Sequence, residues 1–337
     1  SMNYSMQEYA NDVVSVLQDI CDNNNQPHPH ILSESGRALV AQHAVLIFDV
    51  LGANELGLNK DAVAPSISEE DHSVLHSMYE AYTLVSAKNA QECFNDALAA
   101  KEESVDLFSH GVIDIETRAR IDELFWATCK KIQKMVDTLP YVPEDLTNLN
   151  KMLSDTYYCN FSVFQSIPDA WAVGHLFPIM PIHRLDEAPT QEAIIADLTC
   201  DSDGKIDQFI DLRDVKKTLR LHKLQDNQPY YLGAFLVGAY QETLGDLHNL
   251  FGDTNAIHVS IDEDGNYRLE HVVVGDTVSE VLSYVEYDRL ELIRSVRESA
   301  EISVRKGNLT FEQSAKLMRR YENALSGYTY LIEKNNL

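Results

Sequence analysis

The order of hydrophobic and polar positions divides the chain into helical segments and strand-rich segments. Apolar residues recur every three or four positions in residues 8–21, from 68 to about 152 and from 277 onward, which predicts helices. Between them, short β-branched and aromatic runs bounded by turn residues predict strands. These strands are expected at 44–51, 157–163, 176–182, 193–199, 217–221, 230–237, 256–261 and 267–274. Residues 53–68 carry glycine and proline and are expected to form a loop.

The start of the chain predicts one α/β unit. Residues 30–37, His-Ile-Leu-Ser-Glu-Ser-Gly-Arg, follow the first helix and favour a short strand with a polar end. Since one such unit cannot make a sheet, we expect the chain to begin part-way through an α/β domain. The seven later strands indicate a β-sandwich or β-barrel. The helical segment 68–152 is then a bundle inserted into this β domain, with Pro140 and Pro143 before its last short helix. The expected fold class is α+β.

The chain is strongly acidic. Its 337 residues carry 27 Lys and Arg against 53 Asp and Glu, a net charge of −26 at pH 7. Such a surface repels nucleic acids and anionic membranes, and it suits cationic ligands. The sequence also has no run of about 18 apolar residues that could cross a bilayer. We therefore expect neither a nucleic-acid partner nor a membrane partner.

Cysteine usage indicates a reducing compartment. Cys21, Cys93, Cys129, Cys159 and Cys200 are odd in number and widely spaced. Their spacing matches neither a structural zinc site nor a disulfide framework. We therefore expect a cytoplasmic protein.

Two polar stretches follow predicted strands, where loops carry function. Ser33–Arg37 combines a glycine that permits close backbone approach, an arginine that can grip a phosphate and a glutamate that can pair with a protonated ring nitrogen. A local Glu–Arg ion pair is the alternative. Cys200–Gly204 puts a thiol and two carboxylates in a turn after the strand 193–199. Its alternative is an acidic turn beside an ordinary half-buried cysteine.

Two further stretches mix aromatic and polar residues. Residues 160–169, Asn-Phe-Ser-Val-Phe-Gln-Ser-Ile-Pro-Asp, suit either a ligand wall or a strand followed by a capped helix. Gly238 stands just before Tyr240, an arrangement that can hold a phosphate or simply turn the chain from strand to helix. The common nucleotide-binding and nucleophile motifs, G-x-G-x-x-G, G-x-x-x-x-G-K and G-x-S-x-G, are absent from the sequence.

Together these stretches resemble the biosynthetic arginine decarboxylases, relatives of the ornithine and diaminopimelate decarboxylases that use pyridoxal 5′-phosphate (PLP). The matching sequences are SESGR at 33–37, NFSVFQSIPDAW at 160–171, DLTCDSDGKID at 197–207 and VGAYQETLGDLHNLFGD at 237–253. The likeness covers most of this chain, but only the carboxyl-terminal part of that family's chain. The family's Schiff-base lysine and glycine-rich phosphate loop lie on earlier barrel strands without a counterpart here. We therefore expect this chain alone to be inactive.

The resemblance implies five parts. They are the last helix and strand of a (β/α)8 barrel at 1–40, the first strand of a β-barrel domain at 41–66, an inserted helical bundle at 67–153, the rest of the β-barrel domain at 154–285 and a helical extension at 286–337.

The resemblance also implies the cofactor contacts. Glu34 would pair with the pyridinium nitrogen of PLP, and Gly36, Arg37 and Tyr240 would hold its phosphate. A magnesium requirement follows from the resemblance alone, because no set of ligands for it is evident in the sequence.

The substrate contacts implied by the resemblance lie elsewhere in the chain. Cys200 would be a proton donor and Asp201 an anchor for the cationic end of the substrate, both entering the active site of the partner subunit. Ser162 would line the substrate wall. The implied reaction converts L-arginine to agmatine and CO2 for polyamine biosynthesis, in a homodimer or higher homo-oligomer. Two other hypotheses remain open: a non-catalytic partner subunit that completes the site of a full-length decarboxylase, and an inactive fragment.

Overall fold

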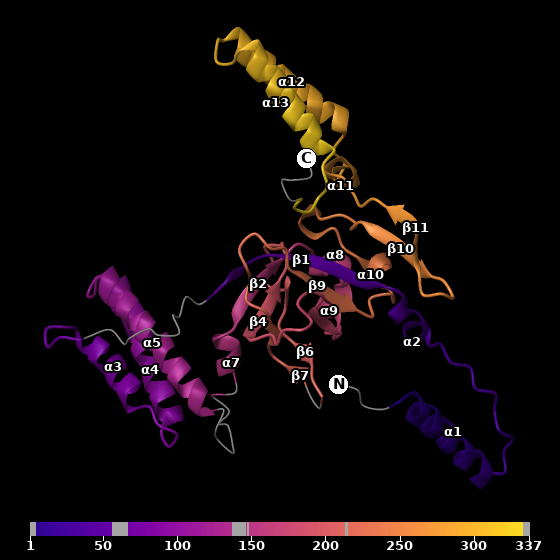
Figure 1. Ribbon diagram of the computed structural model, residues 1–337, viewed down its shortest axis with the longest axis horizontal. Helices are drawn as coiled ribbons and strands as arrows, with labels where there is room; N and C mark the ends of the chain where they lie inside the picture. Colours follow the sequence, from indigo (N-terminus) through magenta and orange to yellow (C-terminus); the bar gives the residue numbers. More distant parts are fainter. Residues whose placement is uncertain (1–4, 56–66, 137–145, 147, 213–214, 333–337) are drawn as a thin grey trace.

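The computed structural model describes residues 5–55, 67–136, 146, 148–212 and 215–332. Within these ranges, a helical bundle lies on one side of a central sheet, and a helical hairpin projects above the sheet (Figure 1). Helix α1 (Met6–Asn23) begins at a Ser5 cap and lies apart from the sheet, with none of its residues buried. The α+β class is confirmed. The (β/α)8 barrel and the five domain boundaries stay predictions.

The central sheet has seven strands within the described ranges. Six follow the order β3 (Ile179–Pro181), β9 (Tyr231–Phe235), β1 (Val45–Asn54), β2 (Asp155–Cys159), β4 (Gln191–Ala196) and β5 (Lys205–Ile206), and β8 (Leu219–Leu221) also pairs with β4. The pairs are antiparallel except β2 with β4. A buried cluster that includes Phe48, Tyr157 and Phe161 fills one side of this sheet, and the Phe48 and Phe161 rings stack 4.3 Å apart.

Two small sheets accompany the main one. β6 (Phe209–Ile210) pairs with β7 (Val215–Lys216), and β10 (Ala256–Ile261) pairs with β11 (Tyr267–Val273). The second pair is a hairpin whose β11 strand is exposed along its whole length. The prediction for β10 is confirmed at both ends, because alternating β-branched residues and an Asp-Gly turn mark this hairpin clearly.

The helical bundle joins β1 to β2. It comprises α3 (Ser73–Leu84), α4 (Ala90–Ser109), α5 (Ile115–Val136) and the short α7 (Leu149–Met152). Their apolar stripes form one core of fully buried side chains, as the spacing predicted. Pro140 and Pro143 lie outside the described residues.

Several local predictions differ from the structure; the strand expected at 193–199, for example, ends at Ala196. The strand expected within residues 30–37 is wrong, since residues 24–35 have no regular structure and helix α2 (Gly36–Val40) follows them. A parallel strand needs hydrogen-bonding neighbours, and none of the described residues pairs with this segment. The strand expected at 157–163 ends at Cys159. The loop expected at 53–68 begins only after β1, and its residues 56–66 lie outside the described ranges.

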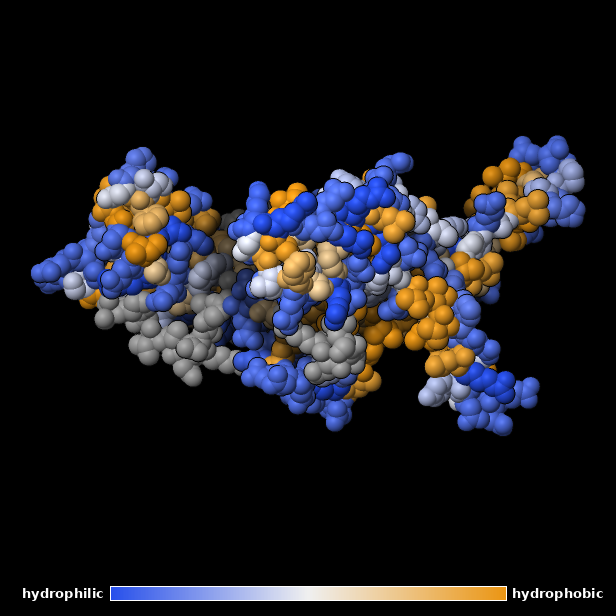
Figure 2. Space-filling view, turned by 90° about the horizontal axis from the view of Figure 1, so that it is seen from above, coloured by the Kyte–Doolittle hydropathy of each residue, from blue (hydrophilic) through white to orange (hydrophobic). Residues whose placement is uncertain are grey.

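The carboxyl-terminal part is helical, as expected. α11 (Val278–Tyr284), α12 (Arg289–Arg305) and α13 (Phe311–Leu325) each begin at a side-chain cap. No helix among the described residues is long and apolar enough to cross a membrane. Seen from above, hydrophilic side chains cover much of the molecule, with hydrophobic patches between them, as its charge suggests (Figure 2).

Candidate active site

Arg37 and Asp169 form an ion pair between two short helices. Arg37 lies at the start of α2, and Asp169 lies in α9 (Pro168–Ala172). Nη2 of Arg37 donates to Oδ2 of Asp169 at 2.6 Å. Gln241 contacts Asp169 twice, donating from Nε2 to Oδ2 at 2.7 Å and accepting from its backbone N–H at 3.1 Å. Burial raises the pKa of Asp169, but the hydrogen bonds from Gln241 and Arg37 outweigh it and leave the pKa below its usual value.

The other side of the Arg37 guanidinium offers a free donor. Nη1 of Arg37 is buried and has no hydrogen-bond partner among the described residues. The ring of Tyr240 lies 5.1 Å from this guanidinium, and a Cβ on Gly36 would lie 2.9 Å from the Tyr240 hydroxyl. A planar guanidinium with a free N–H beside a phenol hydroxyl is suited to an oxyanion. The structure therefore brings together three of the four residues predicted to bind the cofactor.

Tyr240 owes its position to a left-handed backbone. Its φ is 69°, and α10 (Gln241–Leu244) begins directly after it. This turn sends Tyr240 outward, half-exposed, while the next side chain, Gln241, is buried against Asp169. Glu34, the fourth predicted residue, is exposed in the irregular segment before α2.

The Cys200 turn is built on Asp197. The Asp197 carboxylate is 4% exposed and accepts from the backbone N–H groups of Val163 and Thr199, each at 2.8 Å, and from the Thr199 hydroxyl at 2.7 Å. Burial raises the pKa of Asp197 above its usual value despite these hydrogen bonds. Gly204 closes the turn, because a Cβ there would collide with the Asp197 carboxylate.

Cys200 and Asp201 are displayed side by side at the tip of this turn. Cys200 is exposed, and Oδ1 of Asn249 accepts from its backbone N–H at 3.2 Å and lies 3.7 Å from its Sγ. Oδ2 of Asp201 lies 3.8 Å from Nε2 of His248. By contrast, Cys129 and Cys159 are buried, and burial raises their thiol pKa values, to about 12 for Cys129. Cys200 is thus placed for chemistry with an external molecule.

The phosphate-binding candidates and the Cys200 turn are separate groups. No hydrogen bond or ion pair among the described residues joins Arg37 or Tyr240 to Cys200 or Asp201. Ser162 belongs to neither group, because it is fully buried and accepts from the Gln165 N–H at 3.3 Å as the cap of α8 (Val163–Ser166). Its role on the substrate wall stays a prediction.

Sequence reasoning missed three residues at these sites. Asp169, Gln241 and Asn249 all lie within the stretches that looked unusual, yet none was given a role. Their only signal was the presence of polar residues among buried aromatic ones. Their partners, Arg37 and Cys200, are distant in sequence, so the pairing depends on the tertiary structure.

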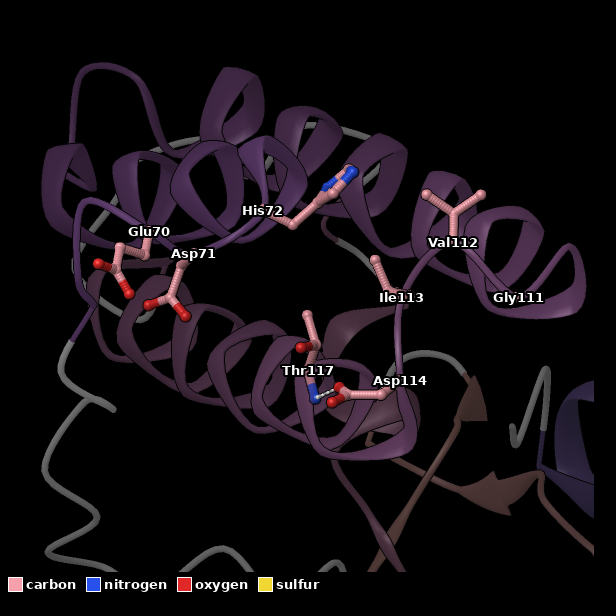
Figure 3. A pocket seen from close by; sticks show the side chains of 8 residues that line it. All are labelled: Glu70, Asp71, His72, Gly111, Val112, Ile113, Asp114 and Thr117. Atoms are coloured by element: carbon pink, nitrogen blue, oxygen red, sulfur yellow. Dashed lines mark hydrogen bonds between the residues drawn. The ribbon is translucent and has the colours of Figure 1, made fainter.

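A pocket of about 410 Å³ lies in the helical bundle, between the start of α3 and the α4–α5 connection (Figure 3). Two of the three acidic side chains in its lining, Asp71 and Asp114, already have partners. Asp71 accepts two hydrogen bonds from Arg120, at 2.7 and 2.9 Å, which lower its pKa to about 2. Asp114 accepts from the Thr117 N–H at 2.8 Å and caps α5 (Figure 3). We therefore assign no chemistry to this pocket.

Comparison with known proteins identifies the family. Residues 68–150 match the family model described as the arginine decarboxylase helical bundle domain, and residues 278–331 match the arginine decarboxylase C-terminal helical extension. A biosynthetic arginine decarboxylase of Gloeobacter violaceus is 52% identical over 338 residues, which cover 99% of this chain and 52% of the relative. The chain belongs to the biosynthetic arginine decarboxylase family.

Other arginine decarboxylases show the same relation. The biosynthetic arginine decarboxylase of Bacteroides thetaiotaomicron is 47% identical over 331 residues, which cover 98% of this chain and 52% of the relative. The crystal structure of the biosynthetic arginine decarboxylase SpeA from Campylobacter jejuni is 33% identical and has a TM-score of 0.77, covering 98% of this chain and 52% of that chain. The chain therefore spans about half the length of the arginine decarboxylases it matches. The family expected from the sequence motifs is confirmed.

Proposed function

We propose that this chain supplies the carboxyl-terminal part of the active site of a PLP-dependent arginine decarboxylase, which converts L-arginine to agmatine and CO2. The observation that carries the proposal is the buried Nη1 of Arg37, which has no partner among the described residues and lies beside Gly36 and Tyr240. A buried guanidinium N–H without an acceptor is costly, and a phosphate oxygen would satisfy it. The residues present thus fit the phosphate of PLP.

Each residue of this group has a distinct task. Arg37 and the Tyr240 hydroxyl bind phosphate oxygens, and Gly36 leaves room for the Tyr240 hydroxyl and the ligand. Asp169 and Gln241 hold Arg37 so that Nη1 faces the phosphate. The Glu34 carboxylate would accept a hydrogen bond from the protonated ring nitrogen and keep it protonated. When bound, PLP supplies the electron sink that makes loss of CO2 from the substrate possible.

The Cys200 turn acts on the substrate. Asp201 binds the cationic end of arginine, and the Cys200 thiol holds the proton that replaces CO2 on the substrate carbon. Their separation from the Arg37 group supports a site shared between subunits, in which the turn enters the partner's active site. A homodimer or higher homo-oligomer follows from this arrangement. The acidic surface favours a dicationic substrate.

A magnesium requirement remains an inference from the resemblance alone. Among the described residues, no group of three or more His, Cys, Asp or Glu side chains could hold a metal ion. We assign no magnesium ligands.

The test combines product analysis with cofactor binding. The protein that carries this chain, supplied with PLP and L-arginine, should release agmatine and CO2. In the same protein, Arg37→Ala should weaken PLP binding about 10- to 100-fold, the loss expected for one charge-assisted hydrogen bond. Binding of pyridoxal, which lacks the phosphate, should stay unchanged.

A second arginine provides the control. Arg184 also pairs with a carboxylate, donating to Glu187 at 2.6 Å, and no hydrogen bond among the described residues joins it to the Arg37 group. Arg184→Ala should leave PLP affinity as it is. Release of CO2 from ornithine or lysine but not arginine would refute the substrate assignment, and equal weakening of PLP and pyridoxal binding by Arg37→Ala would refute the phosphate site.

A further inference from the structure

The last described residues of the chain pack against Phe251 and Gly252, close to Asn249, which contacts Cys200. Tyr330 is 5% exposed, and its ring stacks on Phe251 with centroids 5.2 Å apart. Its hydroxyl donates to the carbonyl oxygen of Gly252 at 2.9 Å, and the Gly252 N–H donates to Oγ1 of Thr329 at 3.1 Å. Both polar backbone groups of Gly252 and the ring of its neighbour are therefore fixed by the carboxyl-terminal segment.

Asn249, two residues before Phe251, contacts Cys200 directly. Its Oδ1 accepts from the Cys200 N–H at 3.2 Å and lies 3.7 Å from Sγ. Asn249 and Leu250 both have left-handed backbones, with φ of 53° and 60°. Such conformations cost energy for residues other than glycine and persist only where the surroundings hold them. The anchoring of Phe251 and Gly252 provides that support immediately after the turn.

A second set of hydrogen bonds links the carboxyl-terminal segment to the Cys200 turn. Asn160 donates from Nδ2 to the carbonyl of Leu331 at 2.9 Å and accepts from the Leu331 N–H at 3.1 Å. Three residues later, the Val163 N–H donates to Asp197, the buried carboxylate on which the Cys200 turn is built. The carboxyl-terminal segment is therefore linked to the Cys200 turn in two ways, through Phe251 and Gly252 and through Asn160.

We propose that the carboxyl-terminal residues 329–331 position the Cys200 thiol, acting through Phe251, Gly252 and Asn249. The proposal rests on the proposed role of Cys200 as the proton donor. Asn249 touches the thiol, whereas Tyr330 is a positioning residue that acts through the 251–252 backbone. The helical extension α11–α13 therefore contributes to the active site by delivering this segment.

Thiol alkylation tests the proposal without cofactor or substrate. The rate of Cys200 modification by iodoacetamide, mapped by mass spectrometry on the full chain, reports the setting of its thiol. Asn249→Ala should raise this rate about fivefold, the effect of losing one ordinary hydrogen bond. Tyr330→Phe removes only the hydroxyl that binds Gly252, so it should raise the rate about twofold. The buried Cys93, Cys129 and Cys159 serve as internal references.

Tyr328→Phe is the matched control. Its hydroxyl accepts from the Asn255 N–H at 3.1 Å, a bond off the route to Cys200, so its loss should leave the alkylation rate unchanged. Hydrogen exchange of residues 248–253 should accelerate in Tyr330→Phe and not in Tyr328→Phe, while circular dichroism stays native. Unchanged alkylation in both Asn249→Ala and Tyr330→Phe, or equal acceleration in Tyr328→Phe, would overturn the proposal. Failure of the proposed function would appear separately, as absence of agmatine from the wild-type protein.

Discussion

Replacing Asp169 by asparagine removes the charge that holds Arg37 while keeping the shape of the side chain. Oδ2 of Asp169 accepts from Arg37 at 2.6 Å and from Gln241 at 2.7 Å, and Asp169 is 7% exposed. Hydrogen bonds to charged groups contribute about 1.5–3 kcal/mol and those between neutral groups about 0.5–1.5 kcal/mol. Since the Arg37 side chain is 39% exposed, solvent screening reduces its share. We therefore expect Asp169→Asn to lower the free energy of unfolding by about 1–2 kcal/mol at pH 7.

The loss should depend on pH. Burial raises the pKa of Asp169, but the bonds from Gln241 and Arg37 outweigh it, so the folded pKa lies below the unfolded one. A carboxyl group of this kind stabilises the fold above its unfolded pKa, near 3.9, and its contribution disappears as the pH falls through the folded pKa. Wild type and Asp169→Asn should therefore differ most near neutral pH and converge in acid.

Tryptophan fluorescence can report this region selectively. Trp171 lies in α9 with Asp169, and Trp126, the other tryptophan, lies in the bundle helix α5. In a Trp126→Phe background, urea unfolding at pH 7 should show a lower midpoint for Asp169→Asn. Glu187→Gln, which breaks the exposed pair with Arg184, should leave the midpoint unchanged. Equal midpoints of wild type and Asp169→Asn at pH 7, or a difference at pH 3 as large as that at pH 7, would refute the reasoning.

Three further outcomes are expected. In an active decarboxylase, Cys200→Ala should lower turnover and raise the share of pyridoxamine product, while the oligomer stays intact. Product analysis and size-exclusion chromatography measure these effects. Normal turnover without extra pyridoxamine would contradict the prediction. Gly204→Ala should cost about 1–3 kcal/mol of stability through overpacking against Asp197, whereas Gly52→Ala, which has open space, should not, as urea midpoints can show. The exposed apolar residues Tyr9, Val16 and Ile20 on α1 should make the protein self-associate at micromolar concentration, and a clean monomer in sedimentation would contradict this.

Local sequence signals predicted most of the secondary structure. The β10–β11 hairpin and the capped helices α11–α13 depend on residues within a few positions of each other, such as Thr277 and Glu280 in a capping box. The strand prediction for 157–163 failed because a helix-capping residue within it was overlooked. Ser162 caps α8, so the strand expected to reach 163 ends at Cys159.

The contacts between the side chains at the two sites could not be predicted from local sequence patterns. The sequence marked Gly36, Arg37 and Tyr240 as members of unusual stretches, and the structure brings them together. Asp169 and Gln241 complete that group, but their partners are fixed by how α2, α9 and α10 meet. No periodicity or spacing encodes this meeting. The bond from Tyr330 to Gly252 is likewise a tertiary contact between segments with unrelated patterns.

The direct pairing of β1 with β2 has a consequence for how the fold can be altered. Asn54 lies opposite Thr156, so the chain leaves the sheet and returns to the neighbouring strand as in a long hairpin whose tip is the whole helical bundle. The entropy cost of closing such a loop grows only slowly with its length. The bundle is therefore a module that a short turn could replace without changing the strand register, at the cost of the packing of α7 against β4 and of the Lys151–Asp207 ion pair. Insertions and deletions in this family should accumulate there, while the segments carrying Arg37, Asp169 and Cys200 tolerate none.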